Sequence, residues 1–150
     1  MRLFPTLRAL LCGVLAAAAP LPLRAQEAST RAIVRPLGDF TQTWTGEPIA
    51  MPRGHLRLIV SNYEIAPGAV LPVHKHPYPR YAYVQAGLLR VTEAGSGKSR
   101  DFKPGDVIVE GVDQWHFGTN IGSDPVALLV MDFLPKGKTV NTVLRKPPNG

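Results

Sequence analysis

Cysteine is almost missing from this sequence, whose 150 residues contain a single one, Cys12. An internal disulfide framework is therefore excluded. Long apolar runs are also missing, because no stretch of roughly 18 apolar residues marks a permanent membrane span. The chain has no GxSxG, Walker or GxGxxG motif. Nothing in it supports an esterase elbow, nucleotide hydrolysis or nicotinamide chemistry.

The amino terminus has the composition of a secretory signal. A short basic region, Met1–Arg8, precedes an apolar run, Ala9–Ala19, and a small-residue cleavage site follows at Ala25. Two prolines directly after the run argue against a buried core helix. We expect residues 1–25 to be a signal peptide, so that the mature chain begins at Gln26 and is periplasmic or secreted, without a stable membrane anchor.

Cleavage at this site changes the charge and the thiol content of the chain. It removes three arginines and Cys12, which lowers the formal net charge from +6 to +3 and leaves no cysteine. Thiol catalysis is then excluded. Four of the remaining cations follow Pro135, and no basic stripe with interleaved aromatic residues is present. Nucleic acid is therefore not an expected partner.

From Arg31 onward the pattern is that of an all-β protein. Short β-branched and aromatic runs alternate with Pro and Gly, and no long segment keeps a helical period. The predicted strands are Ala32–Arg35, Phe40–Thr43, Leu56–Ile65, Tyr81–Gln85, Leu88–Glu93, Lys98–Phe102, Val107–Glu110, Gln114–Thr119 and Val126–Phe133. We expect one β-barrel domain over residues 26–135 and a basic, disordered or loosely packed C-terminal tail over residues 136–150.

Three of the four histidines occupy informative places. His74 and His76 are two residues apart, so their side chains project from the same face of an extended strand. His116 lies 40 residues further on, in a separate predicted strand. An HxH pair alone is weak evidence for a metal, and the three imidazoles could instead hydrogen-bond one another or a ligand in a metal-free barrel.

The glycines around these histidines carry a resemblance to the cupin superfamily. Gly68, His74, His76 and Gly87 have the spacing of the first cupin motif, and Gly105, His116 and Asn120 have that of the second. More narrowly, the chain resembles small secreted bacterial single-domain cupins of the type-2 kind. The resemblance implies a double-stranded β-helix, or jelly-roll barrel, with the histidines at its mouth.

The same resemblance implies a metal site. His74, His76 and His116 would bind a divalent transition metal, with Fe, Zn, Mn, Ni and Cu all compatible with imidazole ligands. Open coordination positions would suit an oxygenase, a lyase or an isomerase of small molecules. The alternative is a non-catalytic, metal-free periplasmic protein that binds or senses a small molecule. The catalytic residues stay unknown, and a homodimer is plausible for the family.

Arg80 departs from the family pattern, because it stands where the first motif has a metal-binding glutamate. A dication and a guanidinium roughly 5 Å apart would repel by about 6 to 7 kcal/mol at an effective dielectric constant of about 20. Three solutions remain open. Arg80 turns out to the barrel mouth, an anionic substrate lies between it and the metal, or another carboxylate rebalances the site. Glu110, at the end of a predicted strand, is the candidate carboxylate, although a solvated charge is the plainer interpretation.

Two further residues are candidates for substrate binding beside Arg80. Gln114 has the same strand parity as His116, so it could orient a bound molecule, or serve only as a hydrogen-bonding residue of the barrel. Tyr78 lies between Pro77 and Pro79, which could hold its ring at a pocket rim, or leave it as an exposed loop aromatic. The sequence thus predicts a small ligand, anionic if Arg80 anchors it, without identifying it.

Overall fold

The computed structural model describes residues 32–147. The chain divides into two units, Met1–Val34 and Arg35–Gly150, and the strands lie in the second. Residues 32–147 contain nine strands and no helix, so none of them forms a helix able to span a membrane. The strands are β1 (Leu56–Ile65), β2 (His74–Lys75), β3 (Arg80–Ala86), β4 (Leu89–Glu93), β5 (Ser99–Phe102), β6 (Val107–Val109), β7 (His116–Asn120), β8 (Val126–Pro135) and β9 (Val143–Leu144).

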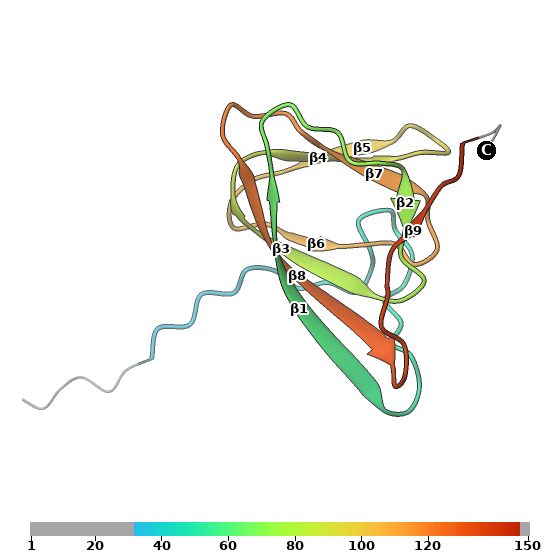
Figure 1. Cartoon of the computed structure of the whole chain (residues 1–150). Coiled ribbons are helices and arrows are strands. Elements are labelled where there is room, and N and C mark those ends of the chain that lie inside the picture. The colour runs from blue at the N-terminus through green and yellow to red at the C-terminus, as the bar shows by residue number, and fades with distance from the viewer. Residues whose placement is uncertain (1–31, 148–150) are drawn as a thin grey trace, which may run out of the picture. The chain divides into compact units, whose positions relative to one another are not determined.

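The strands form two antiparallel sheets. One has the order β1-β8-β3-β6 and the other the order β5-β4-β7-β2-β9. Figure 1 shows β4, β5 and β7 above β3, β8 and β1, so that the second unit is a two-layered barrel. The prediction of an all-β jelly roll is confirmed.

Alternation along the strands builds the core between the sheets. On β8 every second side chain, from Val126 through Leu128 and Val130 to Leu134, is buried. Of these, Val126, Leu128 and Val130 pack with Leu89 and others in one continuous apolar cluster. Asp132 has the same inward parity and is also buried. A carboxylate at such a place needs a partner inside the barrel.

Gly87 makes the tight reversal between β3 and β4. Its φ of 78° lies in the left-handed region, and a Cβ there would stand 2.6 Å from the backbone oxygen of Pro125. Only glycine satisfies both conditions. The geometry of this turn therefore explains why the first cupin motif has a glycine at position 87.

Two predicted strands are absent, and two short strands were not predicted. Residues 32–35 and 40–43 form no strand, because residues 32–42 are exposed and have only one isolated bridge, between Gln42 and Pro48. These two segments contain β-branched residues, but they have no neighbouring strand to pair with. Strands β2 and β9 are two residues long, too short for a periodic pattern, and they pair with each other.

The segment after Pro135 differs in part from the loosely packed tail that the sequence predicts. Residues 136–140 are exposed, but Asn141 is only 4% exposed and β9 extends the second sheet beside β2. Figure 1 shows β9 beside β2, at the end of the barrel. Pairing with β2 gives this polar, Pro-containing segment its order, so it forms part of the barrel wall.

Candidate metal centre

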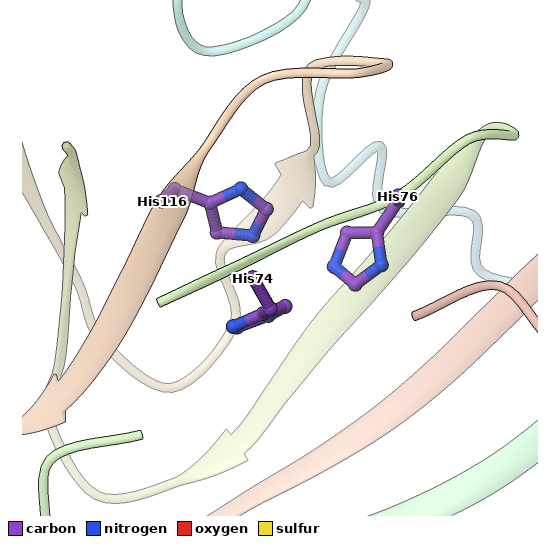
Figure 2. Close-up of side chains that lie close together, drawn as sticks. All are labelled: His74, His76 and His116. Atoms are coloured by element: carbon purple, nitrogen blue, oxygen red, sulfur yellow. The ribbon is translucent and has the colours of Figure 1, made fainter. Parts of the chain in front are cut away.

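The three histidines converge because β2 pairs with β7. His74 and His116 are direct cross-strand partners, and His76 lies two residues further along the same face. The ring centroids are 4.5 Å apart for His74 and His116, 4.9 Å for His74 and His76, and 5.0 Å for His76 and His116. Figure 2 shows the three rings gathered around one point. One nitrogen from each ring lies within 4.8 Å of the others, so the three could hold one metal ion.

Backbone carbonyls fix the tautomer of all three rings. The Nδ1 atom lies 2.7 Å from the Pro72 oxygen in His74, 2.6 Å from the Asn141 oxygen in His76, and 2.8 Å from the Gln114 oxygen in His116. A carbonyl oxygen only accepts, so each Nδ1 carries the proton and donates it. A ring whose proton is held at Nδ1 presents its Nε2 lone pair as the possible ligand atom, which is the arrangement that metal-binding histidines use.

Glu110 faces the same centre from the end of β6. Its Oε2 lies 3.0 Å from His76 Nε2 and 2.9 Å from His116 Nε2. Both Glu110 Oε2 and His116 Nε2 are buried without a hydrogen-bond donor. Two lone pairs facing each other in a buried site need a proton or a cation between them. The residues present therefore fit a cation, and the solvated charge expected as the plainer role of Glu110 is not what the structure shows.

The protonation equilibria of these groups follow from the same contacts. Burial lowers the pKa of His74 to about 4, so this ring stays neutral and available as a ligand. Burial would also lower the pKa of His116, but the adjacent carboxylate of Glu110 outweighs it and raises that pKa. Burial would raise the pKa of Glu110, yet the adjacent imidazoles of His116 and His76 hold it well below the ordinary value.

Arg80 points into the barrel, and a carboxylate that sequence reasoning missed pairs with it. Its Nε lies 2.7 Å from Asp132 Oδ1 and its Nη2 lies 2.9 Å from Asp132 Oδ2. The two residues are cross-strand partners on β3 and β8. Burial opposes the charge of Arg80, but the bonds to Asp132 and the nearby Glu110 raise its pKa. The outward alternative is thus excluded, and carboxylates balance the guanidinium.

The C-terminal segment closes the site through Asn141. Its Nδ2 donates to Asp132 Oδ1 at 2.6 Å and to the Tyr78 oxygen at 3.1 Å, while its Oδ1 accepts from the Tyr78 N–H at 2.9 Å. Its backbone oxygen holds His76. Asn141 therefore joins a histidine, the buried ion pair and the loop before β3. Nothing in the sequence pattern indicated Asn141, whereas an aspartate inside an apolar strand was a signal for Asp132.

Two cavities of different character adjoin Glu110. The inner cavity, about 30 Å³, lies inside the barrel against His74, Arg80, Glu110 and His116. It has room for about one water. The outer cavity, about 380 Å³, lies between residues 43–52, the loop that contains Tyr78, and the end of β6.

The three candidate substrate residues do not share one place. Arg80 lies in the inner cavity, and Tyr78 lines the outer one. Gln114 lines neither cavity, and its amide accepts a hydrogen bond of 2.6 Å from Thr45 and donates one to Glu47. Strand parity failed for Gln114 because β7 begins only at His116. Hydrogen bonds from Thr43, Thr45 and Gln114 lower the pKa of Glu47 to about 2.

The chain is similar to known proteins at the level of one domain. Residues 61–132 match the family model described as a cupin domain. A search of the curated proteins found no match.

Solved structures share the fold. A conserved protein with a double-stranded β-helix domain from Klebsiella pneumoniae is 21% identical, with 78% of this chain and 100% of that chain covered and a TM-score of 0.50. The polyketide cyclase RemF from Streptomyces resistomycificus is 21% identical, with coverage of 61% and 65% and a TM-score of 0.50. The Lactobacillus farciminis oxalate decarboxylase formate complex is 24% identical, with coverage of 58% and 26% and a TM-score of 0.48.

Proposed function

Residues 61–132 form a cupin domain, and from that premise we propose that this protein binds a divalent transition metal through His74, His76, His116 and Glu110 and uses it to bind or transform a small molecule. The observation that carries the proposal is the common tautomer of the three rings. Three separate backbone oxygens hold the three Nδ1 protons. The three Nε2 lone pairs then remain for one ion.

The charges around the centre support a cation there. Arg80 and Asp132 neutralise each other within the barrel, so Glu110 is left as the carboxylate beside the three imidazole rings. Glu110 supplies the carboxylate that the family takes from the position of Arg80. A set of three imidazole nitrogens and one carboxylate oxygen suits Fe, Zn, Mn, Ni or Cu, and no thiolate biases the choice.

The inner cavity provides a place for chemistry at the metal. The ion would act as a Lewis acid, or as a redox centre if it is Fe, Mn or Cu. Arg80 Nη1 lies 3.4 Å from His76 Nε2 and is not bonded to Asp132. It can donate a hydrogen bond to a small oxygen ligand in the cavity. The loops around the outer cavity would admit the organic molecule.

Metal analysis tests the proposal directly. The wild-type protein should hold about one metal per chain after chelator treatment and reloading, and its melting temperature should rise with metal because the ion binds the folded state. His116→Ala should remove the metal, and Glu110→Gln should weaken its binding by about tenfold or more. His55→Ala is the control, because His55 is exposed and lies immediately before β1. Equal metal content in the wild type and His116→Ala would refute the site.

We also propose that the protein is exported. The basic, apolar and small-residue segments over residues 1–25 support this. Mass spectrometry of a periplasmic extract should find an amino terminus at or near Gln26. Full-length protein confined to the cytosol would contradict it.

A further inference from the structure

The outer cavity has the size and the mostly apolar lining of a small-molecule site. Its wall consists mostly of Pro, aliphatic and aromatic side chains, among them Ile49, Met51, Tyr78, Tyr81 and Val109. A volume of about 380 Å³ lies in the range of small-molecule sites, which are typically apolar concavities with a few polar groups. The inner cavity is more than ten times smaller and cannot hold an organic molecule.

The charged groups of the outer cavity are acidic. Glu47 and Glu110 are its only charged lining residues within residues 32–147, and no Lys, Arg or His lines it. Glu47 accepts hydrogen bonds from Thr43 and Gln114 and is ionised. In the metal-free protein, an anion entering this space would lose hydration and meet two carboxylates, with no Lys, Arg or His in the lining to compensate. An uncharged apolar molecule meets neither penalty.

Glu110 is the connection between this cavity and the metal centre. It lines both the outer and the inner cavity, and its Oε2 contacts His76 and His116. A molecule in the outer cavity therefore contacts Glu110, one of the proposed metal ligands. Arg80, the expected anchor of an anion, is instead buried on the inner side and paired with Asp132.

We propose that the outer cavity is the ligand site of this protein and that its ligand is an uncharged, largely apolar small molecule, which meets the metal centre at Glu110. The inference rests on the proposed function for the role of the metal, but not for the existence of the site. It replaces the anionic ligand that Arg80 suggested in the sequence.

The walls of the cavity are held before a ligand arrives. Asn141 makes two hydrogen bonds to the backbone of Tyr78, and prolines flank that residue on both sides. On the opposite wall, the Trp44 N–H donates to the Val109 oxygen at 2.9 Å, and the Ile49 N–H donates to the Thr41 oxygen at 3.1 Å. A preorganised wall lowers the conformational cost of binding.

Two fluorescent probes with the same ring skeleton separate the charge classes. N-phenyl-1-naphthylamine is uncharged, and 8-anilino-1-naphthalenesulfonate carries one negative charge on the same skeleton. We expect the uncharged probe to bind the purified protein with an increase in fluorescence, and the sulfonate to bind about tenfold or more weakly. Both titrations are made on chelator-treated and on metal-loaded protein.

Two variants test whether the uncharged probe binds in the outer cavity. Ala50→Phe introduces a ring into the cavity wall and should weaken binding of the uncharged probe by about tenfold. Tyr81→Ala removes part of the wall and should also weaken it. Tyr83→Ala is the matched control, because Tyr83 lies two residues further along β3 and does not line the cavity. Unchanged melting temperatures would show that the variants are folded.

The outcomes distinguish this inference from the proposed function. Selective binding of the uncharged probe that Ala50→Phe and Tyr81→Ala weaken, with Tyr83→Ala unchanged, supports the site whether or not the chain retains metal. Equal affinity for both probes, or equal binding by wild type and both wall variants, overturns it even if the metal is present. Failure of metal binding alone overturns only the metal centre.

Discussion

The inner and outer cavities share Glu110 in their linings, but they differ in volume and in the elements that line them. The inner cavity is small, and strands β2, β3 and β7 carry most of its charged and imidazole groups, which lie among apolar side chains of the core. The outer cavity is large and apolar, and much of its wall comes from residues 43–52 and 77–79. Under the proposed function, this difference means that the strands of the barrel position the histidines for an ion, while the loops line the space for the ligand. Strands fix side chains accurately, whereas loops can vary without unfolding the core.

The largest expected effect comes from breaking the ion pair of the inner region. Asp132→Ala leaves the guanidinium of Arg80 buried without its partner, which should destabilise the protein by about 3 to 5 kcal/mol. Urea unfolding measures the loss.

The chain offers a matched control for that change. Arg90 and Asp101 form a pair with the same two-bonded geometry, but both side chains are nearly half exposed. Asp101→Ala should therefore have a much smaller effect, because water solvates the released guanidinium. Similar losses for the two variants would show that burial of Arg80 is not what makes its pair matter.

An intermediate effect is expected where the two cavities share support. Asn141→Ala removes the bonds to Asp132 and to both sides of the Tyr78 peptide backbone, so it should loosen His76 and the outer wall together. We expect metal affinity to fall by about 10-fold to 100-fold and binding of the uncharged probe to weaken as well.

Competition with a chromophoric chelator measures the metal affinity, with Asn62→Ala on the exposed part of β1 as control. A loss of metal affinity without any change in probe binding would separate the two cavities. No change in either would remove Asn141 from the supporting network.

The smallest effect on stability is expected for Glu47, which lines the outer cavity. The pKa of Glu47 is about 2 in the folded protein and 4.5 ordinarily, so the unfolded chain binds more protons between these values. The stabilisation by Glu47 is present above pH 4.5 and is lost as the pH falls toward 2. Because Glu47 is exposed, this stabilisation should amount to about 1 kcal/mol or less.

Glu47→Gln should flatten this part of the curve of unfolding free energy against pH and leave the metal content unchanged. Chemical unfolding at several pH values from 2 to 6 measures it. A curve identical to that of the wild type would show that the threonine and glutamine bonds do not stabilise the ionised form.

The linear pattern was sufficient for the local features of the fold. Alternation of apolar residues predicted β1 over its full length, Leu56–Ile65, and β8 to within two residues. The HxH spacing placed His74 and His76 on one face, because side chains alternate along any extended strand. The cupin resemblance added His116 and the jelly roll. These features depend on backbone geometry and neighbours close in the chain.

Only the tertiary structure decided what surrounds those histidines. Asp132 and Asn141 lie 52 and 61 residues after Arg80 in the chain, and the packing of β8 and the C-terminal segment brings them together. Whether Arg80 pointed inward depended on such a partner. Glu110 became the site carboxylate for the same reason, since β6 ends beside two imidazole rings. Desolvation and charge pairing act between groups close in space, so a linear pattern cannot supply them.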